Sequence, residues 1–237
     1  MPTTASPRSS GQPGPAPKRL PVTLTEEETQ ALLSQVNPGR PLGLRNRALL
    51  AALLGAGLRV SEVVALRPGD LNFREGTVEI KHGKERVIPV DGDTLAWLNA
   101  WAQKRKSLGL GARQPFLCRV RTKGVDPDAL PAGGPMTVRN VQALVSRLGR
   151  EAGLEKRATP RTLRHTYATR LLDRGFTLQE VQVLLGHSDV SSTMVYAQVS
   201  SETLKAKVQS QASRADLAAH IATLETELAA LRKTAGL

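Results

Sequence analysis

Two arginines of the sequence are spaced so that they could hold one anion together. Arg161 and Arg164 are three residues apart and follow Thr159 and Pro160, a pair typical of the start of a helix. At this spacing both side chains project from one helix face, and the free amides of a helix N-terminus also favour anions. Two guanidiniums placed in this way can bind a phosphate in bidentate fashion. From spacing alone, two solvated surface charges are the favoured alternative, because charge runs are common on helices.

Further cationic and phenolic side chains lie next to predicted turns or helix ends. They are Arg59 after Gly55 and Gly57, Lys81 in a predicted hairpin, His187 after the helix-ending Gly186, and Tyr196 nine residues later. An isolated tyrosine packs more often than it attacks, so Tyr196 taken alone fits a packing residue better than a nucleophile. Together these groups indicate a phosphate-binding protein, and phosphoryl transfer is the chemistry that they would support.

Metal-dependent and nucleotide-dependent chemistry lack the motifs that they need. The chain has one cysteine, Cys118, and four histidines, without an HExxH motif or paired cysteines, so we expect no metal site. It also lacks a GxxxxGK[ST] loop, and we therefore expect no nucleotide cofactor. A single cysteine excludes an internal disulfide, and we expect Cys118 to be a small core residue.

The charge balance indicates what the protein binds. Its 237 residues include 33 Lys and Arg against 21 Asp and Glu, a net charge of +12, which indicates a polyanionic partner. Aromatic residues make up only 3%, which argues against a protein that stacks the bases of single strands. Residues 48–54 form the longest apolar run, too short to span a bilayer, and residues 1–20 lack a signal-peptide core. We therefore expect a soluble cytoplasmic protein that binds nucleic acid.

The elements that must position these residues are mostly helices. Apolar periodicity and capping signals predict helices over residues 25–36, 43–54, 60–66 and 93–106, and four more that begin near Thr137, Thr159, Thr177 and Ser192. Two β-rich runs, residues 77–81 and 86–90, flank a charged turn and predict an antiparallel hairpin. The predicted fold class is α+β, mainly helical, with one small antiparallel β-sheet.

The two ends of the chain differ from its middle. Residues 1–22 are rich in proline and contain three basic residues but no acidic one, which predicts a disordered basic tail. Residues 201–237 are expected to form an amphipathic helix, because five apolar residues have heptad spacing: Leu217, Ile221, Leu224, Leu228 and Leu231. This pattern fits either a helix that lies on its own domain or a short coiled coil between protomers.

Four segments, taken in order, resemble the catalytic domain of the tyrosine recombinase (phage integrase) family. They are GLRVSEVVALRPGDL (57–71), IKHGKERVIPV (80–90), TPRTLRHTYATRLLDRG (159–175) and VQVLLGHSDVSSTMVYAQVS (181–200). The resemblance covers about three quarters of the chain and is highly specific, because order and internal spacing both agree. It implies a catalytic domain that breaks and rejoins DNA over residues 23–200.

The resemblance implies a role for each candidate residue. The family's catalytic positions fall on Arg59, Lys81, Arg161, Arg164, His187 and Tyr196, and its supporting positions fall on Glu62 and His165. Tyr196 would attack a DNA phosphodiester and form a 3′-phosphotyrosyl bond without a metal or another cofactor. Arg59 and Arg164 would neutralise the charge that develops on the phosphate, with a hydrogen bond from His187. Lys81 would act as general acid for the 5′ oxygen.

Arg161 is the one departure from the family's pattern, which has histidine at this position. Both side chains can donate a hydrogen bond to a phosphate, but a guanidinium cannot accept a proton near neutral pH. Arg161 is therefore expected to stabilise charge without acting as a base. Tyr167, the other tyrosine of the chain, is predicted to be a packing residue.

The family also implies partners and a location. We expect double-stranded DNA as substrate, a homotetramer on DNA to which the C-terminal helix contributes, and no membrane contact. Such a protein would be cytoplasmic and associated with the nucleoid. About 24 residues precede the resemblance, so the chain resembles short members without an N-terminal core-binding domain, such as fimbrial switch invertases.

Three functions would use this set of residues. The first is a site-specific recombinase or integrase. The second is a non-catalytic DNA-binding regulator on the same fold, which needs the basic surface but not Tyr196. The third is a type IB-like topoisomerase, which relaxes DNA without exchanging partners. A supercoil-relaxation assay beside a covalent-trapping assay separates the three.

Overall fold

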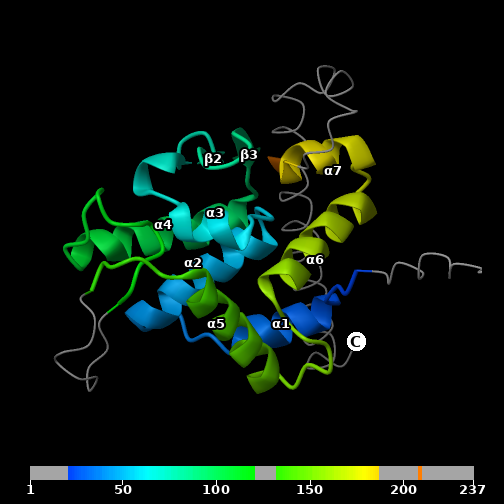
Figure 1. Ribbon diagram of the computed structural model, residues 1–237, viewed down its shortest axis with the longest axis horizontal. Helices are drawn as coiled ribbons and strands as arrows, with labels where there is room; N and C mark the ends of the chain where they lie inside the picture. The colour runs from blue at the N-terminus through cyan, green and yellow to red at the C-terminus, as the bar shows by residue number, and fades with distance from the viewer. Residues whose placement is uncertain (1–20, 121–131, 187–207, 210–237) are drawn as a thin grey trace, which may run out of the picture.

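The computed structural model describes residues 21–120, 132–186 and 208–209. Within them the chain forms a mainly helical α+β fold (Figure 1), as predicted. Its elements are α1 (Glu26–Ser34), α2 (Pro41–Leu54), α3 (Val60–Ala65), the 3₁₀ helix η1 (Pro68–Asp70), β1 (Leu71–Asn72), β2 (Thr77–Ile80), β3 (Arg86–Pro89), α4 (Gly92–Ser107), α5 (Val138–Glu151), α6 (Pro160–Asp173) and α7 (Leu178–Leu185). No helix in these described ranges is long and apolar enough to cross a membrane. The predicted basic tail, the helix from Ser192 and nearly all of residues 201–237 lie outside them.

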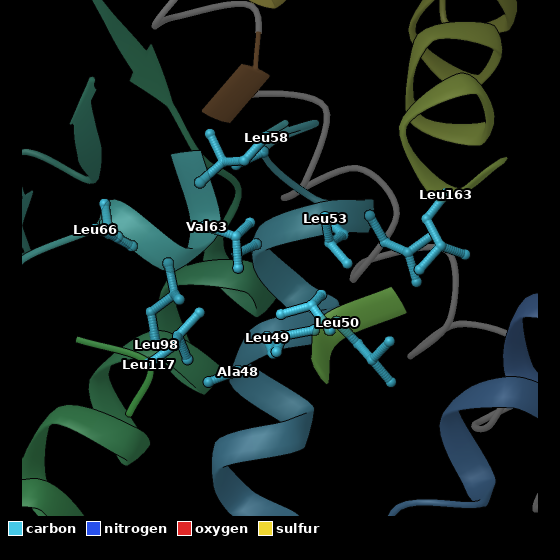
Figure 2. Close-up of a cluster of buried hydrophobic side chains, with 14 of the residues drawn as sticks. Ala48, Leu49, Leu50, Leu53, Leu58, Val63, Leu66, Leu98, Leu117 and Leu163 are labelled. Atoms are coloured by element: carbon cyan, nitrogen blue, oxygen red, sulfur yellow. The ribbon is translucent and has the colours of Figure 1, made fainter. Parts of the chain in front are cut away.

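Helix α2 lies at the centre of the core. Six of its last seven residues are buried alanine or leucine, so the helix is covered on nearly all sides. It packs against both α4 and α6. Figure 2 shows Leu49, Leu50 and Leu53 of α2 in the cluster that includes Leu98 of α4 and Leu163 of α6. Each fully buried leucine stabilises the fold by about 1.5–3 kcal/mol. The position of α2, and with it the start of the turn that follows, is therefore well fixed.

The small sheet carries one more strand than the sequence predicts. Its three antiparallel strands have the order β1-β2-β3, and β2 and β3 form the predicted hairpin, with Ile80 opposite Arg86. Strand β1 was missed because its two residues are too few to show an alternating pattern. Lys81 follows β2 directly and Arg86 begins β3, so one hairpin carries both cations.

Helices α5, α6 and α7 begin where their capping residues predict. Thr137, Thr159 and Thr177 are N-caps, and the side chain of each accepts a hydrogen bond from a backbone amide of the first turn. Helix α7 ends at Gly186, which has a left-handed φ of 63° that favours glycine. These starts and this end fix where Arg161 and Arg164 lie on α6 and where the chain leaves α7.

Two buried arginines fix the segment that follows α4. Arg105 donates to the carbonyl of Phe116 at 2.7 Å and to Sγ of Cys118 at 3.3 Å, and Arg45 donates to the carbonyl of Cys118 at 3.2 Å. Burial lowers the pKa of Arg45 to about 10. Cys118 is buried, as predicted. Nε1 of Trp101 also donates to the carbonyl of Phe116 at 2.8 Å, so these buried carbonyls have hydrogen-bond partners.

Candidate active site

The site is built around the carboxylate of Glu62, whose side chain is only 4% exposed. Oε1 of Glu62 accepts from Nη1 of Arg59 at 2.9 Å and from Nη1 of Arg86 at 2.9 Å. Oε2 accepts from Nη2 of Arg86 at 3.0 Å and from the backbone amide of Arg59 at 2.7 Å. Nη1 of Arg164 lies 3.9 Å from Oε2. One buried carboxylate therefore faces three guanidiniums.

The turn between α2 and α3 places two of these arginines. Gly57 has a φ of 59°, and a Cβ at this position would lie 2.3 Å from the ring of Tyr167, so only glycine fits. The carbonyl of Gly57 accepts from Nη1 of Arg164 at 2.7 Å. Arg59 is the N-cap of α3, and Glu62 reaches back to its amide as in a capping box. The short turn therefore places Arg59 and receives Arg164 from α6.

The last carbonyls of α7 accept hydrogen bonds from the same three arginines. Each takes a different donor: Leu184 from Nε of Arg86 at 2.9 Å, Leu185 from Nη2 of Arg164 at 2.6 Å, and Gly186 from Nη2 of Arg59 at 2.6 Å. Carbonyls at a helix C-terminus have no partner within the helix and carry partial negative charge. The end of α7 therefore binds all three arginines of the cluster.

The electrostatics leave this cluster positively charged at neutral pH. Burial raises the pKa of Glu62, but hydrogen bonds from Arg86 and from the backbone of Arg59 outweigh it and hold the pKa below its ordinary value. Burial, followed by the nearby charge of Arg59, lowers the pKa of Arg164 to about 10. Arg164 therefore remains charged at neutral pH, and it faces the ionised carboxylate together with the guanidiniums of Arg59 and Arg86. The surplus positive charge suits a phosphate.

Lys81 lies beside the cluster. Its Nζ is 3.1 Å from Oδ1 of Asp70 and 3.1 Å from Oε2 of Glu79, and its side chain is half exposed. Hydrogen bonds to Asp70 and then to Glu79 raise the pKa of Lys81 above its ordinary value. Lys81 and Glu62 line the same small pocket, so the hairpin brings this amine to the edge of the arginine cluster.

Arg161 and His165 form a separate, more exposed pair on α6. Nε of Arg161 donates to Nε2 of His165 at 3.2 Å. Burial, and then the charges of Arg161 and Arg164, lower the pKa of His165. The imidazole is therefore neutral at neutral pH and can accept this hydrogen bond.

The structure thus brings together Arg59, Glu62 and Arg164, with Lys81 at the edge. His187 and Tyr196 lie outside the described residues. Tyr167 is buried against α7, in agreement with its prediction as a packing residue. In the described part of the chain, no group of three or more His, Cys, Asp or Glu side chains could hold a metal ion.

Sequence reasoning missed Arg86 as a member of the site. Arg86 was included only as part of the segment 80–90 that carries the family resemblance, and no role was assigned to it. A charged residue at the start of a strand that is otherwise apolar was the available signal. Its partners, Glu62 and Leu184, are 24 and 98 residues away, so no local pattern could identify them.

Comparison with known proteins defines the class to which this fold and site belong. The sequence profile of the phage integrase family matches residues 22–203. Tyrosine recombinase XerD of Vibrio cholerae is 36% identical over 192 residues, which cover 80% of this chain and 61% of that protein. The crystal structure of XerA recombinase matches with a TM-score of 0.61 and 25% identity, covering 82% of this chain and 64% of that one. XerH site-specific recombinase bound to difH substrate matches with a TM-score of 0.56 and 25% identity, covering 76% and 51%.

The described fold is that of a tyrosine recombinase catalytic domain. The chain belongs to the phage integrase family. It spans about three fifths of the length of the curated relatives that it matches.

Replacement of Glu62 by glutamine is expected to reduce stability in a pH-dependent way. The pKa of Glu62 in the folded protein is below its ordinary value of 4.5. The stability that its charge contributes is therefore present above pH 4.5 and is lost as the pH falls through the folded pKa. At pH 7 Glu62→Gln leaves buried arginines uncompensated and should lower the free energy of unfolding by about 3 kcal/mol.

Urea unfolding of wild type and Glu62→Gln at pH 7 and pH 3 measures this effect. The difference in free energy of unfolding should shrink at pH 3. Glu85→Gln, which removes an exposed carboxylate of the hairpin turn, is the matched control and should change little at either pH. An equal loss for Glu62→Gln at both values would show that the charge of this residue contributes nothing.

Proposed function

We propose that this protein is a site-specific DNA recombinase that cleaves and rejoins double-stranded DNA through a 3′-phosphotyrosyl intermediate on Tyr196. The observation that carries the proposal is the cluster of Arg59 and Arg164 around buried Glu62, with Lys81 at its edge. Membership of the phage integrase family supports it, as does the likeness to XerH bound to its difH substrate. Such a DNA substrate would place the protein on the nucleoid, in the cytoplasm.

The arginine cluster is suited to the charge of a phosphoryl-transfer transition state. The side chain of Arg59 is 36% exposed, and Arg59 uses two of its five N–H donors for Glu62 and Gly186. The remaining guanidinium donors have no partner among the described residues and can bind the non-bridging oxygens of a phosphodiester. Because the guanidiniums are already fixed by the protein, little reorganisation is needed when charge develops on the phosphate.

Each bond made in the proposed reaction is matched by one broken. The phenolic oxygen of Tyr196 attacks phosphorus, the bond from phosphorus to O5′ breaks, and the phenolic proton leaves to solvent. Lys81 gives its proton to O5′. The raised pKa of Lys81, caused first by Asp70, keeps its amine protonated at neutral pH, as a general acid must be. The phosphotyrosine keeps the energy of the broken bond, so a 5′-hydroxyl can reverse the step without a nucleotide.

Tyr196→Phe is expected to abolish covalent trapping and to retain DNA binding. With a half-site suicide substrate, wild type should give a denaturation-resistant adduct that the variant lacks, because phenylalanine has no oxygen to attack phosphorus. Tyr167→Phe is the matched control. Burial raises the pKa of the Tyr167 phenol, and its hydroxyl has no hydrogen-bond partner among the described residues, so its loss should affect neither folding nor trapping.

An adduct that survives Tyr196→Phe and disappears with Tyr167→Phe would overturn the assignment. A supercoil-relaxation assay on the same variants addresses the two alternatives. The regulator would give neither an adduct nor relaxation, whereas the topoisomerase would relax a plasmid as a monomer.

Arg161 is expected to stabilise charge without taking a proton. Arg161→Ala should slow cleavage by about 10²-fold or more, the usual effect of losing one charge-stabilising donor. Arg161→His should stay active and move the pH-rate profile towards neutrality, because imidazole can accept a proton there. Single-turnover cleavage from pH 6 to pH 10 measures both effects. Arg150→Ala, at an exposed arginine of α5, is the control for a lost charge. Cleavage by Arg161→Ala at the wild-type rate would place residue 161 outside the site.

We infer that the protein works as a homotetramer on DNA and that the predicted C-terminal helix joins protomers. Val208, which lies within residues 201–237, is buried against α6 and α7 and so anchors this point of the segment to the domain. The heptad residues follow this anchor, from Leu217 to Leu231.

Truncation after Gln211 keeps the Val208 anchor and removes the heptad residues. The truncated protein should bind a single site like wild type and fail to form the larger complex on paired sites. Light scattering and native gels of both proteins on DNA measure the assembly. Unchanged assembly would assign the helix to its own domain instead.

A further inference from the structure

Arg86 is the arginine of the cluster for which the proposed reaction has no role. Its side chain is 8% exposed, compared with 36% for Arg59 and 12% for Arg164. Both of its Nη atoms donate to Glu62, and its Nε donates to the carbonyl of Leu184. A buried guanidinium whose three nitrogens are all engaged is poorly placed to bind a DNA phosphate. Its role must therefore act through the groups that it holds.

The groups that Arg86 holds belong to three different parts of the site. Its backbone begins β3, directly opposite Ile80, the residue before Lys81. Its guanidinium spans the carboxylate of Glu62 on α3 in bidentate fashion, the strongest and most directional form of this pair. Its Nε reaches the end of α7. The side chain of Arg86 thus connects the hairpin both to Glu62 on α3 and to the end of α7.

Gly186 leaves the space in which the Arg86 side chain lies. A Cβ on Gly186 would be 2.9 Å from Nη1, 3.0 Å from Cδ and 3.1 Å from Cζ of Arg86. A free side chain would move aside from such a contact, but Arg86 is held at both ends by its hydrogen bonds. The glycine that ends α7 is therefore also the surface against which the arginine of the hairpin is packed.

The other bonds of Lys81 hold it to the sheet and do not reach the arginines of the cluster. Residues 81–85 are all exposed, and Lys81 pairs with Asp70 and Glu79, neither of which forms an ion pair with Arg59, Arg86 or Arg164 in the described part of the chain. By contrast, Arg59 and Arg164 are held by their own bonds to Gly186, Gly57 and Leu185. Loss of Arg86 should therefore displace the hairpin and leave the two phosphate-binding arginines near their places.

We propose that Arg86 is a positioning residue that holds the Lys81 hairpin against Glu62 and the end of α7. This inference rests on the proposed function, in which Lys81 protonates the 5′ oxygen. A displaced Lys81 slows only the departure of that oxygen. The defect should therefore vanish when the leaving group needs no proton.

The test compares two half-site substrates, one ordinary and one with sulfur in place of the 5′ oxygen at the scissile phosphate. A thiol is far more acidic than an alcohol, so a thiolate leaves without a general acid. Arg86→Leu should cleave the ordinary substrate about 10²-fold more slowly than wild type, the scale expected for a misplaced catalytic group. It should cleave the sulfur substrate at a rate near that of wild type. Lys81→Ala should show the same rescue, and Arg86→Lys should lose less.

Two features of the design keep the outcome clear. The ratio of the two rates is measured on one preparation, so it does not depend on the fraction of protein that is folded. Arg74→Leu, which removes an exposed arginine from the β1–β2 turn of the same sheet, should match wild type on both substrates.

An equal loss on both substrates, or no loss on either, would overturn the role of Arg86. If wild type cleaves neither substrate, the proposed function fails and this inference fails with it. That result differs from the first two, in which wild type is active.

Discussion

A single buried carboxylate allows the rest of this site to exist. Three guanidiniums within reach of one another repel, and their burial in a poorly polarisable interior increases the repulsion. Glu62 offsets this by accepting from Arg59 and Arg86 and by lying 3.9 Å from Arg164. The four elements that carry these residues, α3, β3, α6 and the turn before α3, meet at this point. These elements are arranged so that all three arginines lie close to the single carboxylate of Glu62.

The end of α7 supplies the second source of negative charge. Its three final carbonyls each accept from one of the same arginines, so the partial charge of a helix C-terminus is spread over the cluster. One carboxylate and these carbonyls still do not neutralise three cations. The protein therefore holds a positive surplus in fixed positions, which is the condition under which a phosphate gains most from electrostatic stabilisation.

Local features of the fold were predictable from the sequence, whereas long-range ones were not. The capping box of Thr25 and Glu28 and the N-caps Thr159 and Thr177 depend on residues three positions apart, and all are present. The hairpin followed from its alternating pattern and charged turn. By contrast, Arg86 finds its partners across the fold, and strand β1 is too short to show a pattern. The close approach of Gly57 to the ring of Tyr167 could not be predicted either, because 110 residues separate them. The roles of His187 and Tyr196 remain predictions from the family resemblance.

The position of Arg161 shows why a departure from the family pattern can be accommodated here. Arg161 is exposed, donates to neutral His165 and, in the described part of the chain, forms no ion pair with Glu62. A positive charge at an exposed position is screened by solvent and needs no buried counter-charge. An arginine there adds a donor on the face of α6 without disturbing the balance around Glu62. Replacing Arg86 or Arg164 by histidine would instead disturb the balance of charge around Glu62. Tolerance of substitution in this site therefore depends on how deeply a residue is buried.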